Sequence, residues 1–440
     1  MFERSFCVIL CVMTVMVVMT SQQRTLGGFK EVYAWKQLTY NIDGEILLND
    51  RFSEDVGERE RTKRSDGDII FINNDDDLES YKKQKSLSNT PRPKPTDDEN
   101  SLFIQYNNLP MGVERVGDVL FVAVPRRRYG IPSTLNYINL RDRQRSPPLR
   151  PYPNFRTSRT LTSVYRTRAD VCNRLWMVDT GLMEIPNNPQ QVQQPAIVIF
   201  DLNTNEEILR YPFKDSDLPA ANTPTGLASI TVDINGDCDD AYAYIPDLTT
   251  NGIIVYSMRQ NDSWRLSNVY FNFDPIAATL TVANQTFQWS DGIFSITLSN
   301  PGPDGCRIAY FHPMISTHEF SVSTCTLQNK YLSNQSDYFK YYSMVGERGE
   351  RTQSTMHGYH DDTGVIFFAD IGRDGISCWN SAKMMNPYNV ELLASDQKLM
   401  SYPADLHVTG DEVWTIANTL PKFGYSRLDP NEYNFYIYKG

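Results

Sequence analysis

The sequence lacks the short motifs that mark several large enzyme classes. It contains no GxSxG nucleophile elbow, no P-loop, no GxGxxG turn after a strand, no HExxH helix and no CxxC pair. Only five histidines are present, and the closest two, His357 and His360, would point to opposite faces of a strand. We therefore expect no cofactor, no bound metal and no catalytic residue that a motif could identify.

The chain is also short of positive charge and of long apolar segments. It carries 42 Lys and Arg against 53 Asp and Glu, a formal net charge of −11, which disfavours nucleic acid and anionic membranes as partners. The one long uncharged run, Ser5 to Thr20, ends abruptly at polar residues and predicts a signal peptide over residues 1–21. An uncleaved anchor is the alternative. A cleaved leader predicts a secreted, extracellular protein.

Residues 53–100 have few aromatic or aliphatic side chains and many charges, a composition typical of disorder. Within them, Arg61-Thr62-Lys63-Arg64 resembles a furin-type processing site with cleavage after Arg64, although an ordinary solvated charge run has the same composition. This insertion separates an expected N-terminal strand region, residues 22–52, from the main domain at 101–440. Sequons at Asn261, Asn284 and Asn334 predict N-glycosylation.

What the chain does contain is aromatic residues, 12% of the total, including 25 Tyr. Such residues favour strands. A short apolar strand after a polar turn recurs six times, with landmarks 47 to 67 residues apart at positions 117, 172, 238, 305, 363 and 410. This repeat predicts an all-β, six-bladed β-propeller. Pairing of the N-terminal strand 32–40 with the C-terminal strand 434–438 would close the ring.

A second set of strands precedes the landmarks and is expected to line the central channel: GVERV, TSVYRTR, LASITVDI, DGIFSIT, STMHGYH and PADLHVT. Polar and aromatic side chains on or beside these strands, with Asn418 after the last landmark strand, make the channel the candidate ligand site. The residues are Glu114, Ser163, Tyr165, Ser229, Asp291, Phe294, Ser354, Tyr402, Asp405 and Asn418. Each acid or hydroxyl could equally tie down a strand end. The arginines between Arg126 and Arg168, including Arg126-Arg127-Arg128, could attract an anion, but a solvated face is the default expectation.

Five cysteines remain after the leader, so one thiol must stay unpaired. Cys172 and Cys238 open equivalent strands of adjacent blades, which predicts a disulfide between them. Cys306 and Cys325 flank a hairpin with its turn at Ile315–Ser316, which places them opposite each other. Pairing of Cys325 with Cys378 is the alternative.

Several segments together resemble the insect yellow and major royal jelly protein family. They include AWKQL at 34–38, LPMGVE at 109–114, VPRRRYGIPSTL at 124–135, CNRLWMVDTG at 172–181, CDDAYAY at 238–244, FQWSDGIF at 287–294, YFHP at 310–313, FSVST at 320–324 and SCWN at 377–380. The resemblance implies a secreted six-bladed propeller. It also implies binding of biogenic amines in the channel, or action on dopachrome in the melanin pathway.

Three functional hypotheses follow. The first is an extracellular protein that binds small aromatic amines or catechol-type ligands in cuticle pigmentation, because carboxylates between aromatic walls suit a protonated amine. The second is an isomerase that tautomerises dopachrome. The third is a metal-dependent, lactonase-like hydrolase in which Glu114, Asp291 and Asp405 converge on one cation. A structural or nutritive role remains if no small molecule binds. Since no motif supplies a base, the sequence favours binding over catalysis.

Overall fold

The computed structural model describes residues 25–52, 101–220, 223–234, 236–332, 335 and 337–440. The expected signal peptide, the Arg64 site and the Asn334 sequon lie outside these residues. Among the residues described, no helix is long and apolar enough to cross a bilayer. Asn261 and Asn284 are both exposed, as glycan acceptors must be.

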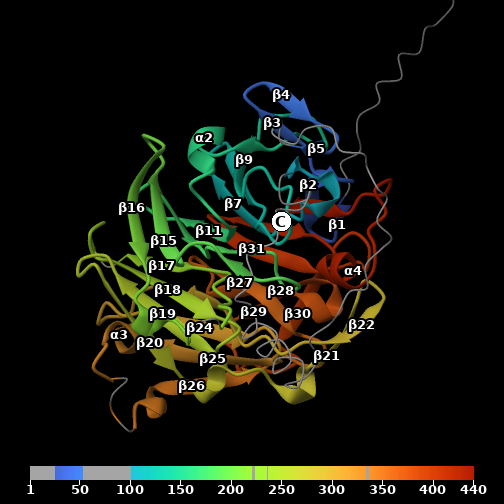
Figure 1. Ribbon diagram of the computed structural model, residues 1–440. Coiled ribbons are helices and arrows are strands. Elements are labelled where there is room, and N and C mark those ends of the chain that lie inside the picture. Colours follow the sequence, from blue (N-terminus) through green and yellow to red (C-terminus); the bar gives the residue numbers. More distant parts are fainter. Residues whose placement is uncertain (1–24, 53–100, 221–222, 235, 333–334, 336) are drawn as a thin grey trace, which may run out of the picture.

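Six antiparallel sheets form the blades of a propeller, as the repeat predicts. Figure 1 labels β7, β11, β27 and β31 near the middle of the ring and β16, β20 and β26 toward its rim. The first blade contains β7 (Gly112–Val116), β8 (Val119–Ala123), β9 (Leu135–Asn139) and β10 (Arg150–Pro151). The second contains β11 (Val164–Ala169), β12 (Arg174–Asp179), β15 (Ala196–Asp201) and β16 (Glu206–Pro212).

The next three blades follow the same order from the centre outward. Blade three contains β17 (Thr231–Ile234), β18 (Ala241–Asp247), β19 (Gly252–Ser257) and β20 (Asp262–Ser267). Blade four contains β23 (Ile293–Leu298), β24 (Ile308–Pro313), β25 (His318–Ser323) and β26 (Tyr342–Glu347). Blade five contains β27 (Ser354–His360), β28 (Val365–Asp370), β29 (Gly375–Asn380) and β30 (Val390–Ser395).

The sixth blade joins the two ends of the described chain. Its strands are β31 (Pro403–Thr409), β32 (Glu412–Ala417), β33 (Phe435–Lys439), β2 (Phe29–Trp35) and β1 (Thr25–Leu26). β2 pairs with β33 from Lys30↔Lys439 to Trp35↔Phe435, and Figure 1 shows the blue strand beside the red ones. The predicted ring closure is confirmed, although β2 ends at Trp35 rather than Tyr40.

Short elements connect the blades. They are β3 (Tyr40–Ile42), β4 (Glu45–Leu47), β5 (Arg51–Phe52), β6 (Ser101–Phe103), β13 (Leu182–Met183), β14 (Gln190–Gln191), β21 (Thr279–Val282), β22 (Gln285–Gln288), α2 (Phe155–Ser158), α3 (Thr324–Gln328), α4 (Leu420–Tyr425), η1 (Gln105–Asn107), η2 (Asp215–Asp217), η3 (Val269–Phe271), η4 (Pro275–Ala277), η6 (Tyr338–Tyr341) and η7 (Ile371–Arg373).

Burial follows the position of a strand within its blade. All six residues of β12 are buried, because both of its edges are paired and both of its faces pack against other blades. β16, at the rim, keeps most of its side chains at least partly exposed. This gradient explains why the landmark strands, which lie second from the centre, are the most apolar in the sequence.

The cysteine pairing matches the expectation. Cys172 and Cys238 form a disulfide that links the β11–β12 turn to the β17–β18 turn of the next blade. Cys306 and Cys325 form a second disulfide across the β24–β25 hairpin, where Ile308 pairs with Ser323. Cys378, on β29, is a free thiol.

Candidate functional site

The centre of the ring is crossed by the side chain of Arg166, which projects from β11. Its guanidinium donates to the Ala228 carbonyl at 2.8 Å and to the Ala404 carbonyl, and lies 4.8 Å from the ring centroid of Phe294. These partners belong to blades three, six and four, and the Arg166 side chain is fully buried. Arg166 therefore connects blade two with blades three, four and six.

Further along the innermost strands, the predicted acids Glu114 and Asp405 are paired with arginines. Arg168 lies 3.5 Å from Glu114 and 3.3 Å from Asp405. Asp405 also accepts the Val113 N–H at 2.9 Å. Burial raises the pKa of Glu114 to about 8, with Arg168 opposing the rise. His407 Nε2, 3.2 Å from Glu114, has its pKa lowered by burial and by Arg168.

This pairing corrects two expectations. Arg126, Arg166 and Arg168 are not on a solvated face, because their guanidinium groups satisfy buried carbonyls and carboxylates. The three acids proposed to share a cation do not converge. Arginines contact Glu114 and Asp405, whereas Asp291 is coupled to Arg127, Tyr402 and Tyr425.

Asp291 interacts electrostatically with Arg127, Tyr402 and Tyr425 near the starts of the innermost strands. We call this group the Asp291 cluster: Asp291, Arg127, Tyr165, Trp289, Tyr402 and Tyr425. The ring of Trp289 lies 5.8 Å from that of Tyr402 and 6.4 Å from that of Tyr425, measured between centroids. The Trp289 indole N–H donates to the Tyr425 hydroxyl. Tyr425 belongs to α4, and Trp289 follows the β21–β22 hairpin.

The backbone fixes Asp291 in place. Its carbonyl accepts the Ile315 N–H at 3.2 Å, and the next residue, Gly292, donates to Leu248 and accepts from Met314. Gly292 packs so closely against Asn251 that a Cβ atom would lie 1.9 Å from the Asn251 Oδ1. Packing between blades three and four thus requires a glycine at position 292 and holds the backbone next to Asp291 in place.

The Asp291 carboxylate is open. Among the residues that the structure describes, none donates a hydrogen bond to it, and the side chain keeps partial exposure. Burial raises the pKa of Asp291 to about 6, while the Arg127 guanidinium limits the rise. Burial, with Asp291 adding to it, raises the pKa of the Tyr402 phenol far above its ordinary value, so this tyrosine is neutral. A carboxylate with a pKa near neutrality can exchange a proton with a bound ligand.

Tyr402 has a strained backbone. Its φ is +51°, in the left-handed region that bulky side chains rarely adopt. Its ring is buried, and its hydroxyl lies 3.8 Å from the Met314 sulfur. Strain of this kind, which costs about 1–3 kcal/mol, concentrates at functional sites.

The remaining predicted channel residues bond to the backbone. The Ser163 hydroxyl accepts the Arg126 N–H, Ser229 donates to the Phe294 carbonyl, and Ser354 donates to the Met356 carbonyl. Asn418 donates to Pro110 and accepts from Leu420. All four are buried and tie strand ends together. Of the ten predicted residues, the structure brings Tyr165, Asp291 and Tyr402 into the Asp291 cluster, while Phe294 lies against Arg166.

A second titratable group is fully buried between blades four and five. Glu319 lies 3.0 Å from His312 and 3.1 Å from His357, a spacing that could suit a metal ion. Arg348, however, donates to the same carboxylate at 2.6 Å. The His357 Nδ1 is bonded to Ser295 and the His312 Nε2 to the Thr355 carbonyl. The positive charge of Arg348 next to Glu319, the one carboxylate of this group, disfavours a metal ion there. We therefore assign the group a structural role.

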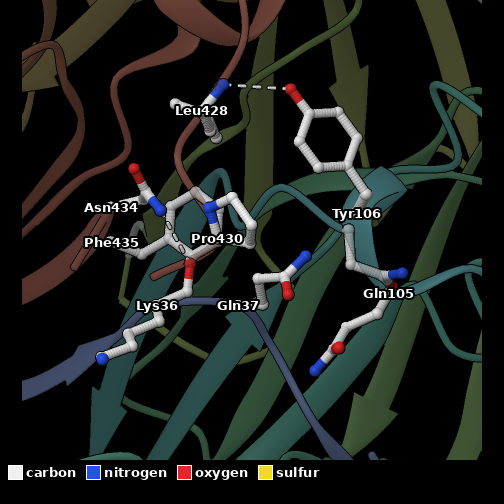
Figure 2. Close-up of a pocket in the computed structure, with 9 residues that line it drawn as sticks. Lys36, Gln37, Gln105, Tyr106, Leu428, Pro430, Asn434 and Phe435 are labelled. Atoms are coloured by element: carbon white, nitrogen blue, oxygen red, sulfur yellow. Dashed lines mark hydrogen bonds between the residues drawn. The ribbon is translucent and has the colours of Figure 1, made fainter. Parts of the chain in front are cut away.

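Figure 2 shows a small recess at the ring closure, between the end of β2 and the loop before β33. Asn434 donates there to the Lys36 carbonyl, and the Tyr106 hydroxyl accepts the Leu428 N–H. Its polar groups are engaged in joining the two chain ends. The recess is therefore a junction rather than a ligand site.

The sequence did not identify Trp289, Tyr425 or Arg166 as site residues, and it indicated Arg127 only as part of an arginine-rich run that could attract an anion. Arg166 could have been identified from its position inside TSVYRTR, one of the predicted innermost strands. Trp289 stands two residues before Asp291 in FQWSDGIF, so it too could have been included. Tyr425 reaches the cluster from α4 and has no such signal.

Comparison with known proteins identifies the family. A sequence profile described as "Major royal jelly protein" matches residues 162–440. The chain is 45% identical to L-dopachrome tautomerase yellow-f of Drosophila melanogaster, covering 77% of this chain and 80% of the relative. It is 36% identical to dopaminechrome tautomerase of the same species, covering 77% and 76%. Protein yellow of that species is 38% identical, covering 76% and 63%.

Among solved structures, virginiamycin B lyase from Staphylococcus aureus matches with a TM-score of 0.39 at 11% identity, covering 76% of this chain and 95% of that one. The family profile spans most of the propeller, from the innermost strand of blade two to the last strand. The chain belongs to the yellow and major royal jelly protein family.

Proposed function

We propose that the chain binds catechol-derived aromatic quinones at the Asp291 cluster and tautomerises aminochromes there, with Asp291 as the proton-transferring base. The observation that carries this proposal is the open Asp291 carboxylate, which has no hydrogen-bond donor among the described residues and a pKa of about 6. Two relatives, at 45% and 36% identity, are named as tautomerases of L-dopachrome and dopaminechrome. A role in pigmentation follows from that reaction.

The chemistry needs no cofactor. An aminochrome is an indoline quinone, and its tautomerisation moves two protons from carbons of the five-membered ring to the two quinone oxygens. No atom is gained or lost, and the electrons stay within the substrate. The Asp291 carboxylate would accept a ring-carbon proton, while water or a protonated Asp291 would return protons to the oxygens. Trp289 and Tyr425 offer aromatic surfaces for a planar ring.

Replacement of Asp291 tests the proposal. Asp291→Asn keeps the size of the side chain and removes the base, so kcat for L-dopachrome should fall by at least about 100-fold. The rate is followed by loss of the quinone absorbance, corrected for the spontaneous reaction. Asp215→Asn, on the exposed η2 turn at the rim, is the matched control and should keep full activity. Wild-type activity in the Asp291 variant would refute the assignment.

The pH profile gives a second readout for the same variant. The base must be ionised, so kcat/KM should fall about tenfold for each pH unit below about 6. The acid limb should disappear from the residual activity of Asp291→Asn. A wild-type profile that is flat down to pH 4 would contradict a base with this pKa.

Binding without turnover is the second candidate function. An open carboxylate surrounded by aromatic rings also suits a protonated aromatic amine, through charge pairing and cation–π contact. Calorimetric titration with dopamine and serotonin distinguishes the two. Saturable amine binding that Asp291→Asn weakens, with no rate above the uncatalysed conversion of L-dopachrome, would favour a carrier.

A further inference from the structure

We propose that Arg127 binds the carboxylate of the substrate, and that it makes the Asp291 cluster selective for carboxylated aminochromes over decarboxylated ones. This inference rests on the proposed tautomerase function and adds a specificity-determining residue to it.

The neighbours of Arg127 fix its position. Arg126 donates to the carbonyls of Leu161, Thr162, Ile131 and Pro132, which fully engages its guanidinium. Arg128 stacks on the Phe423 ring of α4, with its guanidinium carbon 4.1 Å from the ring centroid. The Arg127 N–H donates to the Pro125 carbonyl at 2.7 Å in a tight turn. Arg127 therefore lies between the start of blade two, which holds Arg126, and α4, which carries Tyr425 of the cluster.

Arg127 is coupled to every ionisable residue of the cluster. It influences Tyr165, Asp291, Tyr402 and Tyr425 electrostatically, and its side chain is partly exposed. Within the described ranges it forms no ion pair within 4.0 Å, unlike Arg166 and Arg168. Its fork of N–H donors is thus not committed to any carboxylate of the protein.

The charges of the cluster complement a carboxylated aminochrome. The tyrosines are neutral, so Asp291 and Arg127 are the two formal charges among the cluster's members. L-dopachrome carries a carboxylate next to the ring carbons that lose protons, whereas dopaminechrome has no carboxylate. Arginine binds carboxylates through two parallel hydrogen bonds. Anchoring the carboxylate on Arg127 would hold the adjacent C–H bonds near Asp291.

The experiment compares both substrates on wild type, Arg127→Met and Arg127→Lys. A charge-assisted hydrogen bond contributes about 1.5–3 kcal/mol, so Arg127→Met should lower kcat/KM for L-dopachrome about 10- to 150-fold. The value for dopaminechrome should fall less, because this substrate loses only the effect of Arg127 on the pKa of Asp291. Arg127→Lys keeps the charge and should be intermediate on L-dopachrome. Arg156→Met, on the exposed face of α2, removes one positive charge elsewhere and should leave both values unchanged.

Binding of indole-2-carboxylate and of indole gives a readout that does not depend on turnover. Wild type should bind the carboxylate more tightly, and Arg127→Met should lose that preference. Equal loss of activity on both substrates, or an unchanged preference between the two indoles, would overturn the role of Arg127 and leave the tautomerase proposal intact. Wild type that converts neither aminochrome but keeps an Arg127-dependent preference would instead refute the proposed function alone.

Discussion

Glu114 and Asp291 are both carboxylic acids whose pKa burial raises, yet their partners give them different roles. Glu114 accepts the Ala169 N–H at 3.0 Å and lies 3.2 Å from His407. Asp291 has no such donor among the described residues. Glu114 therefore joins strands of blades one, two and six, whereas Asp291 is available to a ligand.

The raised pKa of Glu114 predicts a pH dependence of stability. A folded-state pKa of about 8, above the ordinary 4.5, means that the folded protein holds this proton more tightly than the unfolded chain. The resulting stability is fully present below pH 4.5 and is lost as the pH rises through 8. The glutamine in Glu114→Gln cannot ionise. Between pH 5 and 9 the free energy of unfolding of this variant should therefore fall by about 1–2 kcal/mol less than that of wild type.

Urea unfolding of both proteins at pH 5, 7 and 9 measures this difference, and the other titrating groups cancel between wild type and variant. Parallel curves for the two proteins across this range would show that Glu114 is ionised in the folded state at neutral pH.

At the scale of elements, the disulfides act at different distances along the chain. Cys172–Cys238 joins two blades across 66 residues, while Cys306–Cys325 closes a single hairpin of 19 residues. A cross-link restricts the unfolded chain more when it closes a longer loop. The inter-blade bond is therefore expected to contribute more to stability.

Double replacement of each pair by alanine tests this expectation. Cys172→Ala with Cys238→Ala should lower the free energy of unfolding by about 2–4 kcal/mol, about 1 kcal/mol more than Cys306→Ala with Cys325→Ala. Thermal and urea unfolding provide the measurement, and reduced wild type provides the reference for both losses. An equal or reversed order would show that native-state packing, rather than loop length, governs the contribution.

The strands could be predicted because each blade repeats one local pattern. VLFVA, RLWMVD and VIFFAD all precede hairpins whose partners follow within about 20 residues, so local sequence defines them. The hairpin centred on Ile315–Ser316 was located closely enough to pair Cys306 with Cys325.

The site was harder to predict, because its members come from five parts of the chain. The three consecutive arginines illustrate this, because nothing in the sequence distinguishes them. Arg126 donates to carbonyls, Arg127 interacts electrostatically with Asp291, and Arg128 packs on the Phe423 ring. Likewise, Asp405 and Asp291 were both expected in one channel. In the structure, Asp405 is paired with Arg168, whereas Asp291 interacts with Arg127, and the spacing of these residues in the sequence does not reveal this difference.

At the scale of the whole molecule, the ring depends on β2. This strand pairs with β33 on one edge, and Tyr33, Ala34 and Trp35 are almost fully buried. Trp35 also donates to the Pro147 carbonyl at 2.8 Å, which connects it to the first blade. The predicted processing site after Arg64 lies between β2 and the rest of the propeller in sequence.

Insect cells should release the protein into the medium with a glycan, which glycosidase treatment will remove.

Cleavage after Arg64 should leave the ring intact, because β2 is held by a strand ladder and buried aromatic rings. After treatment with a furin-type protease, a reducing denaturing gel should show two chains. The same two chains should co-elute in native size-exclusion chromatography. Arg61→Ala with Arg64→Ala is the uncut control. Separation of the fragments under native conditions would contradict this prediction.

The closure of blade six also sets the order in which the molecule is assembled during synthesis. Trp35 and its partner Phe435 are 400 residues apart, whereas every other blade is built from consecutive hairpins. At about 5–20 residues per second, translation of that interval takes about 20–80 s. Hairpins form within about 10 μs, so five blades can be complete while β2 still has no partner. The pairing of β2 with β33, the final step of folding, therefore cannot occur before translation reaches β33. Until then the aromatic side chains of β2 remain exposed to solvent.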